Sequence, residues 1–178
     1  MKIKVPEKLE SERLVIRPFI QDDIDGFYSF MSDEEATKYL LFSEDEKTLA
    51  ASRQLLLRTI GNYDSPDQIY ALAVATKHEN SFIGSVGIGP DFTGEHYQIY
   101  WTILPQFWGK GLATEAAICF MDYLFMEIGF NKIVAYSHPE NVASSKVAEK
   151  AGMQNQGTIM LEGLDHEPLY FEIEKSPK

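Results

Sequence analysis

Cysteine is almost absent from this chain of 178 residues, in which Cys119 is the only one. A single thiol can build neither an internal disulfide framework nor a zinc site made of several cysteines, so both are excluded. Cys119 lies between Ile118 and Phe120 in an apolar helical pattern, which favours packing in the core over nucleophilic catalysis. Apolar runs are short throughout, and none approaches the roughly 20 residues that a membrane-spanning helix needs.

Positive charge is also scarce, because 16 Lys and Arg residues face 27 Asp and Glu residues and leave a formal net charge of -11. A field of that sign repels anionic membranes and the phosphates of nucleic acids, so we expect neither as a partner. The opening MKIKVPEKLESE lacks the apolar stretch of a signal peptide. We therefore expect a cytoplasmic protein, and we treat residues 1–178 as a single domain.

The order of apolar patterns predicts a mixed α/β fold. Alternating apolar residues indicate strands, and apolar residues that recur three and four positions apart indicate helices. The predicted strands are Arg13–Phe19, Ile69–Thr76, Phe82–Pro90, His96–Leu104, Lys132–Ser137, Thr158–Leu161 and Leu169–Glu174. The predicted helices are Asp22–Ser32, Ser43–Asn62, Leu112–Gly129 and Asn141–Gly152. This order predicts one mixed sheet, mainly antiparallel with a parallel pair, flanked by helices.

The segment LPQFWGKGLATEA, residues 104–116, joins the end of a predicted strand to the start of a predicted helix. The first turn of a helix carries unpaired backbone N–H groups and a positive dipole end. Gly109 and Gly111 would let this backbone approach an anion, so the segment can hold a phosphate, although a tight turn explains the same glycines. The spacing excludes both the ATP-binding loop G-x-x-x-x-G-K-[ST] and the dinucleotide-binding loop G-x-G-x-x-G.

A second junction between a strand and a helix follows at HPENVASSKVAEKAGM, residues 138–153. Asn141 is in the position of a helix N-cap and Ser144 is three residues further on, which by itself indicates only a capped helix. Two neighbouring strand–helix units, however, place two helix N-termini at the same edge of a sheet, where they flank a cleft.

Together, P-x-x-W-G-K-G-L-A-T-E-A and N-V-A-S-S-K-V-A-E-K-A-G-M resemble the GCN5-related N-acetyltransferase (GNAT) superfamily, and SERLVIRPFIQDD is similar to the start of its RimJ/RimL-like branch of ribosomal-protein N-terminal acetyltransferases. The resemblance implies acetyl-CoA as cosubstrate and transfer of an acetyl group to a primary amine, either a protein N-terminus or a small amine. It leaves open an acetyltransferase for polyamines, amino acids or drugs, and also a module that binds acetyl-CoA without catalysis. A homodimer is one option for the assembly, and no metal is implied.

The resemblance also implies which residues bind acetyl-CoA. The backbone of Ile103 would pair with the pantetheine arm and supply an N–H to the thioester oxygen, and Asn141 would hydrogen-bond the same arm. In the superfamily pattern [QR]-x-x-G-x-[GA], the first position falls here on Trp108. The residues expected around the pyrophosphate are Trp108, Gly109, Lys110, Gly111, Leu112, Ala113 and Thr114.

Acetyl transfer needs a group that takes a proton from the amine and a group that gives one to the departing thiolate. Ala148 replaces the tyrosine that many superfamily members place in the second helix, and the RimJ/RimL-like branch points instead to Ser144 as the partner of the thiolate. Gln98 replaces the carboxylate that such proteins often carry on the strand before the glycine turn. The candidates for the proton acceptor are the neighbouring Glu95 and His96, followed by Glu162 and His138.

Overall fold

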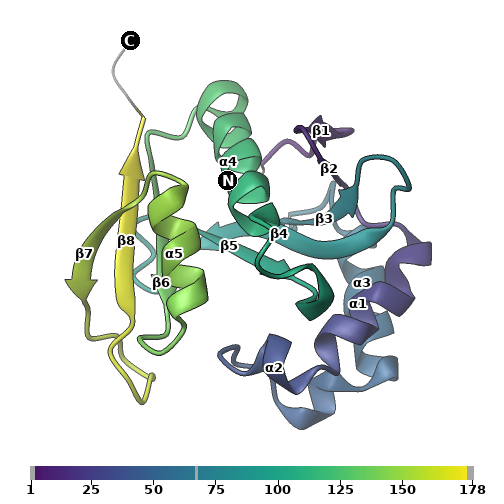
Figure 1. The fold of residues 1–178 in the computed structure, drawn as a ribbon, viewed down its shortest axis with the longest axis horizontal. Helices are drawn as coiled ribbons and strands as arrows, with labels where there is room; N and C mark the ends of the chain where they lie inside the picture. Colours follow the sequence, from purple (N-terminus) through teal and green to yellow (C-terminus); the bar gives the residue numbers. More distant parts are fainter. Residues whose placement is uncertain (1–2, 67, 176–178) are drawn as a thin grey trace.

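A computed structural model describes residues 3–66 and 68–175, which form one mixed β-sheet with helices on both faces (Figure 1). The strands of this sheet follow the order β1-β2-β3-β4-β5-β6-β8-β7. Neighbouring strands run antiparallel except β5 and β6, which are parallel, so the predicted fold class is confirmed. The strands are β1 (Leu9–Glu10), β2 (Leu14–Arg17), β3 (Ala71–Thr76), β4 (Phe82–Pro90), β5 (Tyr97–Ile103), β6 (Lys132–Ser137), β7 (Gln154–Thr158) and β8 (Leu169–Glu174).

The helices are divided between the two faces of the sheet. On one face, α4 (Leu112–Tyr123) packs on β2, β4 and β5, and α5 (Val142–Lys150) lies beside it over β6 and β7 (Figure 1). On the other face, α1 (Ile24–Met31) packs against β4 and against α3 (Leu49–Gly61), and the short α2 (Glu34–Thr37) follows α1. Among the helices that the structure describes, none is long and apolar enough to cross a membrane.

The interior strand β3 has the composition that burial on both faces requires. Leu72 and Val74 pack in the main core under α4, whereas Ala71 and Ala73 belong to the second core under α1 and α3. The two alanines leave room on that side for larger side chains such as Phe27. Burial on both faces explains why this strand reads in the sequence as a continuous apolar run without alternation.

The predicted helix Ser43–Asn62 is divided into two pieces. Glu44–Lys47 form a 3-10 turn, and Thr48 is extended, with φ -74° and ψ 155°, before α3 begins. Each piece has its own N-terminal cap, because the Ser43 N–H donates to the Glu46 carboxylate at 2.9 Å and the Thr48 side chain accepts a hydrogen bond from the first turn of α3. A threonine that caps a helix interrupts the backbone ladder that would have made the two pieces one.

The predicted helix Leu112–Gly129 changes its winding before it ends. After α4, residues Leu124–Ile128 form a π-helical turn, and Gly129 closes it with a φ of 89°. Apolar spacing cannot distinguish this turn from an α-helix, because both continue the same buried stripe.

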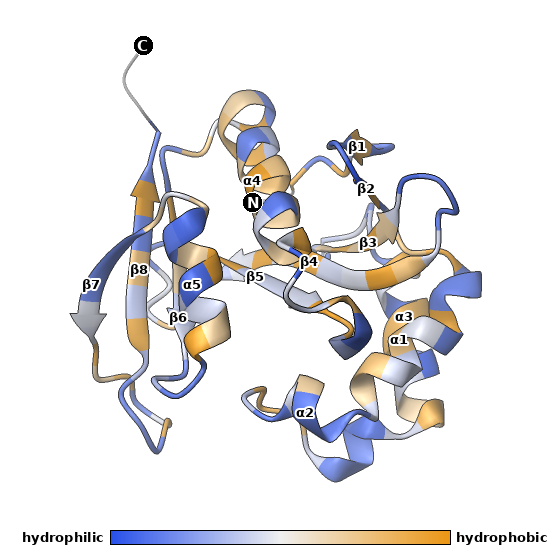
Figure 2. Ribbon diagram, viewed as in Figure 1, coloured by the Kyte–Doolittle hydropathy of each residue, from blue (hydrophilic) through white to orange (hydrophobic). Residues whose placement is uncertain are grey.

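Three short elements differ from the prediction. The sequence pattern missed β1 and α2, which are too short to show a period. The seventh strand runs from Gln154 to Thr158, so the predicted strand Thr158–Leu161 is wrong. Every residue of β7 is exposed, and Figure 2 shows the strand as largely hydrophilic. An exposed edge strand has no alternation of apolar residues by which a sequence could reveal it.

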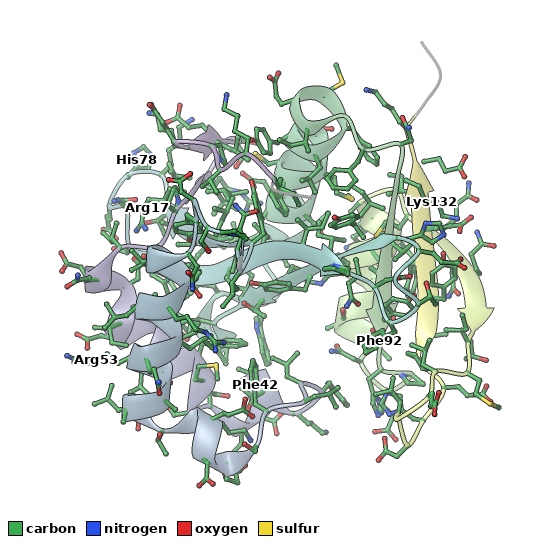
Figure 3. The ribbon with its side chains drawn as sticks, turned by 180° about the vertical axis from the view of Figure 1, so that it is seen from behind. Arg17, Phe42, Arg53, His78, Phe92 and Lys132 are labelled. Atoms are coloured by element: carbon green, nitrogen blue, oxygen red, sulfur yellow. The ribbon has the colours of Figure 1, made fainter. Side chains whose placement is uncertain are left out.

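A buried ion pair joins β2 to the segment that leads into α1. Arg17, which Figure 3 labels, donates to both carboxylate oxygens of Asp23 at 2.8 and 2.9 Å, and its Nε donates to Asn80 Oδ1 at 2.8 Å. Arg17 is 8% exposed and Asp23 is 4% exposed, so neither charge has much access to water. Removal of one partner from such a pair leaves the other charge buried without compensation.

We expect Asp23→Ala to lower the free energy of unfolding by about 3–5 kcal/mol, the range for a broken buried ion pair. Asp22→Ala is the matched control, because Asp22 is exposed, and its effect should stay within about 0.5 kcal/mol. Urea titration followed by circular dichroism measures both variants. Equal midpoints for the two variants would contradict the role assigned to the ion pair.

Candidate active site

Strands β5 and β6 separate soon after they meet. Their parallel pairing is limited to Gln98 and Val134, although β5 continues to Ile103 and β6 continues to Ser137. On its other side, β5 is paired with β4 along its whole length. Beyond Gln98, the edge of β5 that faces β6 therefore has no strand partner among the described residues.

A cavity of about 590 Å³ lies at this gap between the strands. All the residues from Ile99 to Ile103 line it. Because successive side chains of a strand point to opposite faces, a cavity that touches all of them runs along the edge of the strand. Its other walls come from α2, the end of β6, the start of α4 and one side of α5.

The peptide carbonyl of Ile103 points into the gap. The Leu104 N–H donates to the Ile83 carbonyl of β4 at 2.8 Å, and the Ile103 carbonyl, which belongs to the same trans peptide, points the opposite way. The indole N–H of Trp108 donates to this carbonyl at 2.6 Å. The Ile103 N–H lies on the same side of the strand as its carbonyl, and it remains the group that can donate to a ligand in the gap.

The glycine turn before α4 holds its backbone in a conformation that suits an anion. Gly109 and Gly111 have φ values of 73° and 76°, which glycine adopts at no steric cost. In the described part of the chain, no acceptor binds the N–H groups of residues 109–114, and the first bonded amide is that of Glu115. These amides lie at the positive end of the α4 dipole. Among the residues predicted to bind acetyl-CoA, Lys110 alone does not line the cavity, and its ammonium donates to the Gln106 carbonyl at 3.0 Å.

Arg13 holds the glycine turn against the first turn of α4. Its Nη1 donates to the Lys110 carbonyl at 2.9 Å, and its Nε donates to Glu115 Oε2 at 2.7 Å. Glu115 Oε1 accepts from Ser11 Oγ at 2.7 Å and from the Arg13 N–H at 2.8 Å. Partial burial alone would raise the pKa of Glu115, but the hydrogen bonds from Ser11 and Arg13 and the guanidinium charge outweigh it and lower the pKa below its usual value.

Asn141 and Ser144 meet at the start of α5, and both line the cavity. Asn141 Oδ1 accepts from the Ser144 N–H at 3.0 Å, so Asn141 caps the helix as its position indicated. The side-chain NH₂ of Asn141 can still donate to a ligand, and Ser144 Oγ has no partner within residues 3–66 and 68–175. Lys146 and Lys150, one turn apart on the same helix, add positive charge to this wall.

A family model described as an acetyltransferase (GNAT) domain matches residues 13–154. The chain belongs to the GNAT family of N-acetyltransferases. A curated relative, "Uncharacterized N-acetyltransferase YnaD" of Bacillus subtilis (strain 168), is 30% identical over 153 residues, which cover 84% of each chain. The crystal structure of a GNAT-family acetyltransferase from Bacillus anthracis matches with a TM-score of 0.78 at 28% identity, over 94% of this chain and 98% of that chain. Mycobacterium smegmatis RimJ in complex with CoA-disulfide shares the fold, with a TM-score of 0.77 at 16% identity over 98% of this chain and 90% of that chain.

The structure of this GNAT acetyltransferase does not bring Glu95 and His96 to the cavity. Both precede β5, at the end of the strand away from the glycine turn, and neither lines the cavity. The His96 N–H instead donates to Asp91 Oδ1 at 3.2 Å, in the turn that joins β4 to β5. The side chain of Gln98 donates to the Pro90 carbonyl at 3.2 Å. The positions of Glu95 and His96 therefore argue against their interpretation as proton acceptors.

His138 lines the cavity, but its hydrogen bond argues against a role as proton acceptor. Its Nδ1 accepts a hydrogen bond from the Glu140 N–H at 3.1 Å. The neutral ring therefore carries its proton on Nε2, and neither nitrogen is free to accept the proton of an amine. The rings of Tyr39 and His166 pack on His138, with centroid distances of 4.8 and 4.2 Å. Glu162 is exposed and does not line the cavity.

Several residues that sequence analysis did not single out also line the cavity. Glu35 on α2 and Glu140 before α5 bring two carboxylates to its wall. Tyr100 reaches it from β5, and Gly87 on β4 makes room, since a Cβ at that position would come within 2.2 Å of the Tyr100 ring. These polar and aromatic residues lie in turns and on exposed faces, where no periodic pattern marks them. In the described ranges, no group of three or more His, Cys, Asp or Glu side chains could hold a metal ion.

We expect Glu115→Gln to destabilise the protein at neutral pH and to have little effect in acid. A carboxyl group with a lowered pKa in the folded state adds stability above its unfolded pKa, about 4.3 for Glu, and this stability is lost as the pH falls through the folded pKa. The difference in unfolding free energy between wild type and variant should be constant above about pH 5 and shrink below about pH 4. Urea unfolding across this pH range measures it, and a constant difference down to the acid end would contradict the prediction.

Proposed function

We propose that the protein transfers the acetyl group of acetyl-CoA to a primary amine by direct attack of the amine. The observation that carries this proposal is the unpaired edge of β5, which leads directly to the unbonded amides of residues 109–114. An extended chain that contains amides, such as pantetheine, can pair with a strand edge, and a pyrophosphate suits a helix N-terminus. The CoA-disulfide complex of Mycobacterium smegmatis RimJ, which has the same fold, supports the proposal.

The residues present fit acetyl-CoA. The N–H groups of residues 109–114 hold the pyrophosphate, and Lys146 and Lys150 add positive charge from the wall formed by α5. The side-chain amide of Asn141 donates to the pantetheine arm. The cavity volume of about 590 Å³ lies within the range of about 300–1,000 Å³ that small-molecule sites occupy.

Acetyl-CoA supplies an activated acetyl group, and the chain supplies position and charge. The Ile103 N–H donates to the thioester oxygen, where negative charge develops during attack. Ser144 lines the cavity. Its hydroxyl passes a proton to the departing thiolate and takes one from the positively charged nitrogen of the tetrahedral intermediate, so that no serine alkoxide is left. No covalent link to the protein is required, because positioning of the two reactants supplies much of the rate.

The acceptor we propose is the α-amino group of a peptide, as the resemblance to the RimJ/RimL-like branch implies. An α-amino group has a pKa of about 7.7–8.0, against about 10.4 for lysine, so far more of it is neutral at pH 7. That difference matters in a cavity whose β5 wall, residues 99–103, carries no carboxylate; Gln98, which replaces the expected one, does not line the cavity. Mass spectrometry of acetylated products tests it with three acceptors: a peptide with a free N-terminus, the same peptide with a blocked N-terminus and a lysine, and spermidine. Acetylation of spermidine alone would overturn the choice of acceptor.

Substitution of Gly109 tests the binding of the pyrophosphate. Asn and Asp tolerate positive φ better than other residues, and a Cβ at Gly109 meets nothing within 4 Å, so both variants should fold. Ligand binding stabilises the folded state by mass action. We expect coenzyme A to raise the melting temperature of wild type and Gly109→Asn, but not of Gly109→Asp, whose carboxylate repels the phosphates. An equal rise in both variants would contradict the assignment of the glycine turn.

Ser144→Ala tests the proton donor. General acid catalysis contributes about 10²–10⁴-fold, so we expect kcat to fall by about 10²-fold with little change in the KM for acetyl-CoA. Ser145→Ala is the matched control, because Ser145 Oγ bonds to Ser137 and to the Asn141 carbonyl and does not line the cavity. Steady-state kinetics of both variants decide the matter. A wild-type kcat in Ser144→Ala would return this serine to a structural role.

A further inference from the structure

Tyr136 and Asp91 form a polar pair at the edge of the cavity that the proposed function leaves unused. Tyr136 lies on β6 and lines the cavity. Its hydroxyl donates to Asp91 Oδ2 at 3.2 Å, and Asp91 comes directly after β4. The hydrogen bond therefore links β6 to the turn after β4, close to the point where β5 and β6 separate.

The side chain of Tyr136 is on the face of β6 opposite to α4 and α5. Its neighbours in alternation, Ile133 and Ala135, belong to the core under α4. Because side chains alternate along a strand, Tyr136 points to the other face, where its ring contacts Phe92 and Tyr170 with centroid distances of 5.2 and 5.5 Å. The glycine turn and the N-terminus of α5 approach the gap from the α4 side. Tyr136 thus faces the side from which a second substrate can enter.

Asp91 is a buried carboxylate held by several donors. It is 7% exposed, and Thr93 Oγ1 lies 2.9 Å from both of its oxygens. The His96 N–H and the Tyr136 hydroxyl also donate to its carboxylate. Burial alone would raise the pKa of Asp91, but these bonds outweigh it and lower the pKa below its usual value. Asp91 is therefore ionised at neutral pH.

The bond to Asp91 determines what the Tyr136 hydroxyl can do toward a ligand. Burial and the Asp91 charge raise the pKa of Tyr136, so the phenol keeps its single proton and donates it to Asp91. The phenolic oxygen can then only accept hydrogen bonds from other groups. Its partner in the cavity must be a donor, and the negative charge behind it favours a donor that carries positive charge.

We propose that Tyr136, positioned by Asp91, binds the amine acceptor by accepting a hydrogen bond from its nitrogen. This inference rests on the proposed function and names the residue that receives its second substrate. Phe92, which is 49% exposed beside Tyr136, offers an aromatic surface to the same cationic group. The acceptor class is a primary amine that arrives as an ammonium ion, and anionic or purely hydroxylic acceptors are disfavoured.

The pair binds the amine and does not deprotonate it. A relay would move the amine proton to Tyr136 and the phenol proton to Asp91, and it would end with a neutral amine and a protonated Asp91. The pKa of an α-amino group, about 7.7–8.0, exceeds that of an ordinary Asp, about 3.9, by roughly four units, and the Asp91 value is lower still. Such a transfer is unfavourable by more than about 10⁴-fold. The proton of the bound amine therefore leaves to solvent.

Tyr136→Phe removes the proposed acceptor and keeps the ring. With an α-amino peptide as substrate, we expect the KM for the peptide to rise by about 10–100-fold, the effect of losing one hydrogen bond to a charged group. The KM for acetyl-CoA and the thermal shift with coenzyme A should stay at wild-type values. Tyr170→Phe is the matched control, because its hydroxyl bonds to Glu172 on the same face of the sheet and it does not line the cavity. Its kinetics should match the wild type.

Asp91→Asn tests the positioning role, since it removes the charge but retains an oxygen that can accept from Tyr136. We expect a smaller rise in the KM for the peptide in the wild-type background and no further rise in the Tyr136→Phe background. A purely structural contribution of Asp91 would add to the effect of Tyr136→Phe instead. Additive effects in the double variant would overturn the role of Asp91.

A wild-type KM for the peptide in Tyr136→Phe would overturn the role of Tyr136, while acetylation by that variant would leave the proposed function intact. Failure of the proposed function has a different signature: the wild-type protein would show no thermal shift with coenzyme A and would acetylate neither the peptide nor spermidine. The inference would then fall with it. If only spermidine is acetylated, the same comparison of Tyr136→Phe with Tyr170→Phe is made with spermidine, with the same expected rise in KM.

Discussion

The divergence of β5 from β6 is the constraint on which the rest of the site depends. A parallel pair that continued to Ile103 would close the sheet and bond every peptide group along the edge. Because the pairing stops after Gln98, the sheet instead offers one strand edge in its middle, between two helix N-termini. Edges of this kind are a liability on a protein surface, where they pair with other chains. Here the edge lies in a cavity, where only a ligand of the right width can reach it.

The charges of the site are arranged in two layers on either side of this edge. On the α4 side, backbone amides and the lysines of α5 suit an anion, and Arg13 neutralises Glu115, the carboxylate in the first turn of α4. On the other side, Asp91 and Glu35 add negative charge. An acidic chain with a net charge of -11 thus keeps a local region that suits an anion without a cluster of basic side chains at the turn itself. The two sides suit two substrates of opposite charge that meet in the gap.

The fold could be predicted from the sequence wherever burial leaves a period. The run ALAVAT, the alternating β5 and the apolar stripe of α4 each identify their element, and their order predicts the mixed sheet. The glycine turn and the capped start of α5 were predictable too, because glycines at Gly109 and Gly111 and an N-cap at Asn141 are local features. Contacts between residues far apart in the sequence could not be predicted. Asp91 lies in the same turn as Glu95 and His96, but its hydrogen bond to Tyr136 exists only because the fold brings β6 beside that turn.

The contact between Arg13 and Glu115 also determines when the glycine turn can take its shape. The two residues are 102 positions apart, and a contact of that range forms only after the chain between them has closed into a loop. The Arg13–Glu115 contact therefore cannot form during synthesis until the first turn of α4 has been made and β2 has packed against that helix. The segment assigned to the phosphates is thus held in shape by a long-range contact. Affinity for coenzyme A would then be absent from any partly folded form in which this contact has not been made.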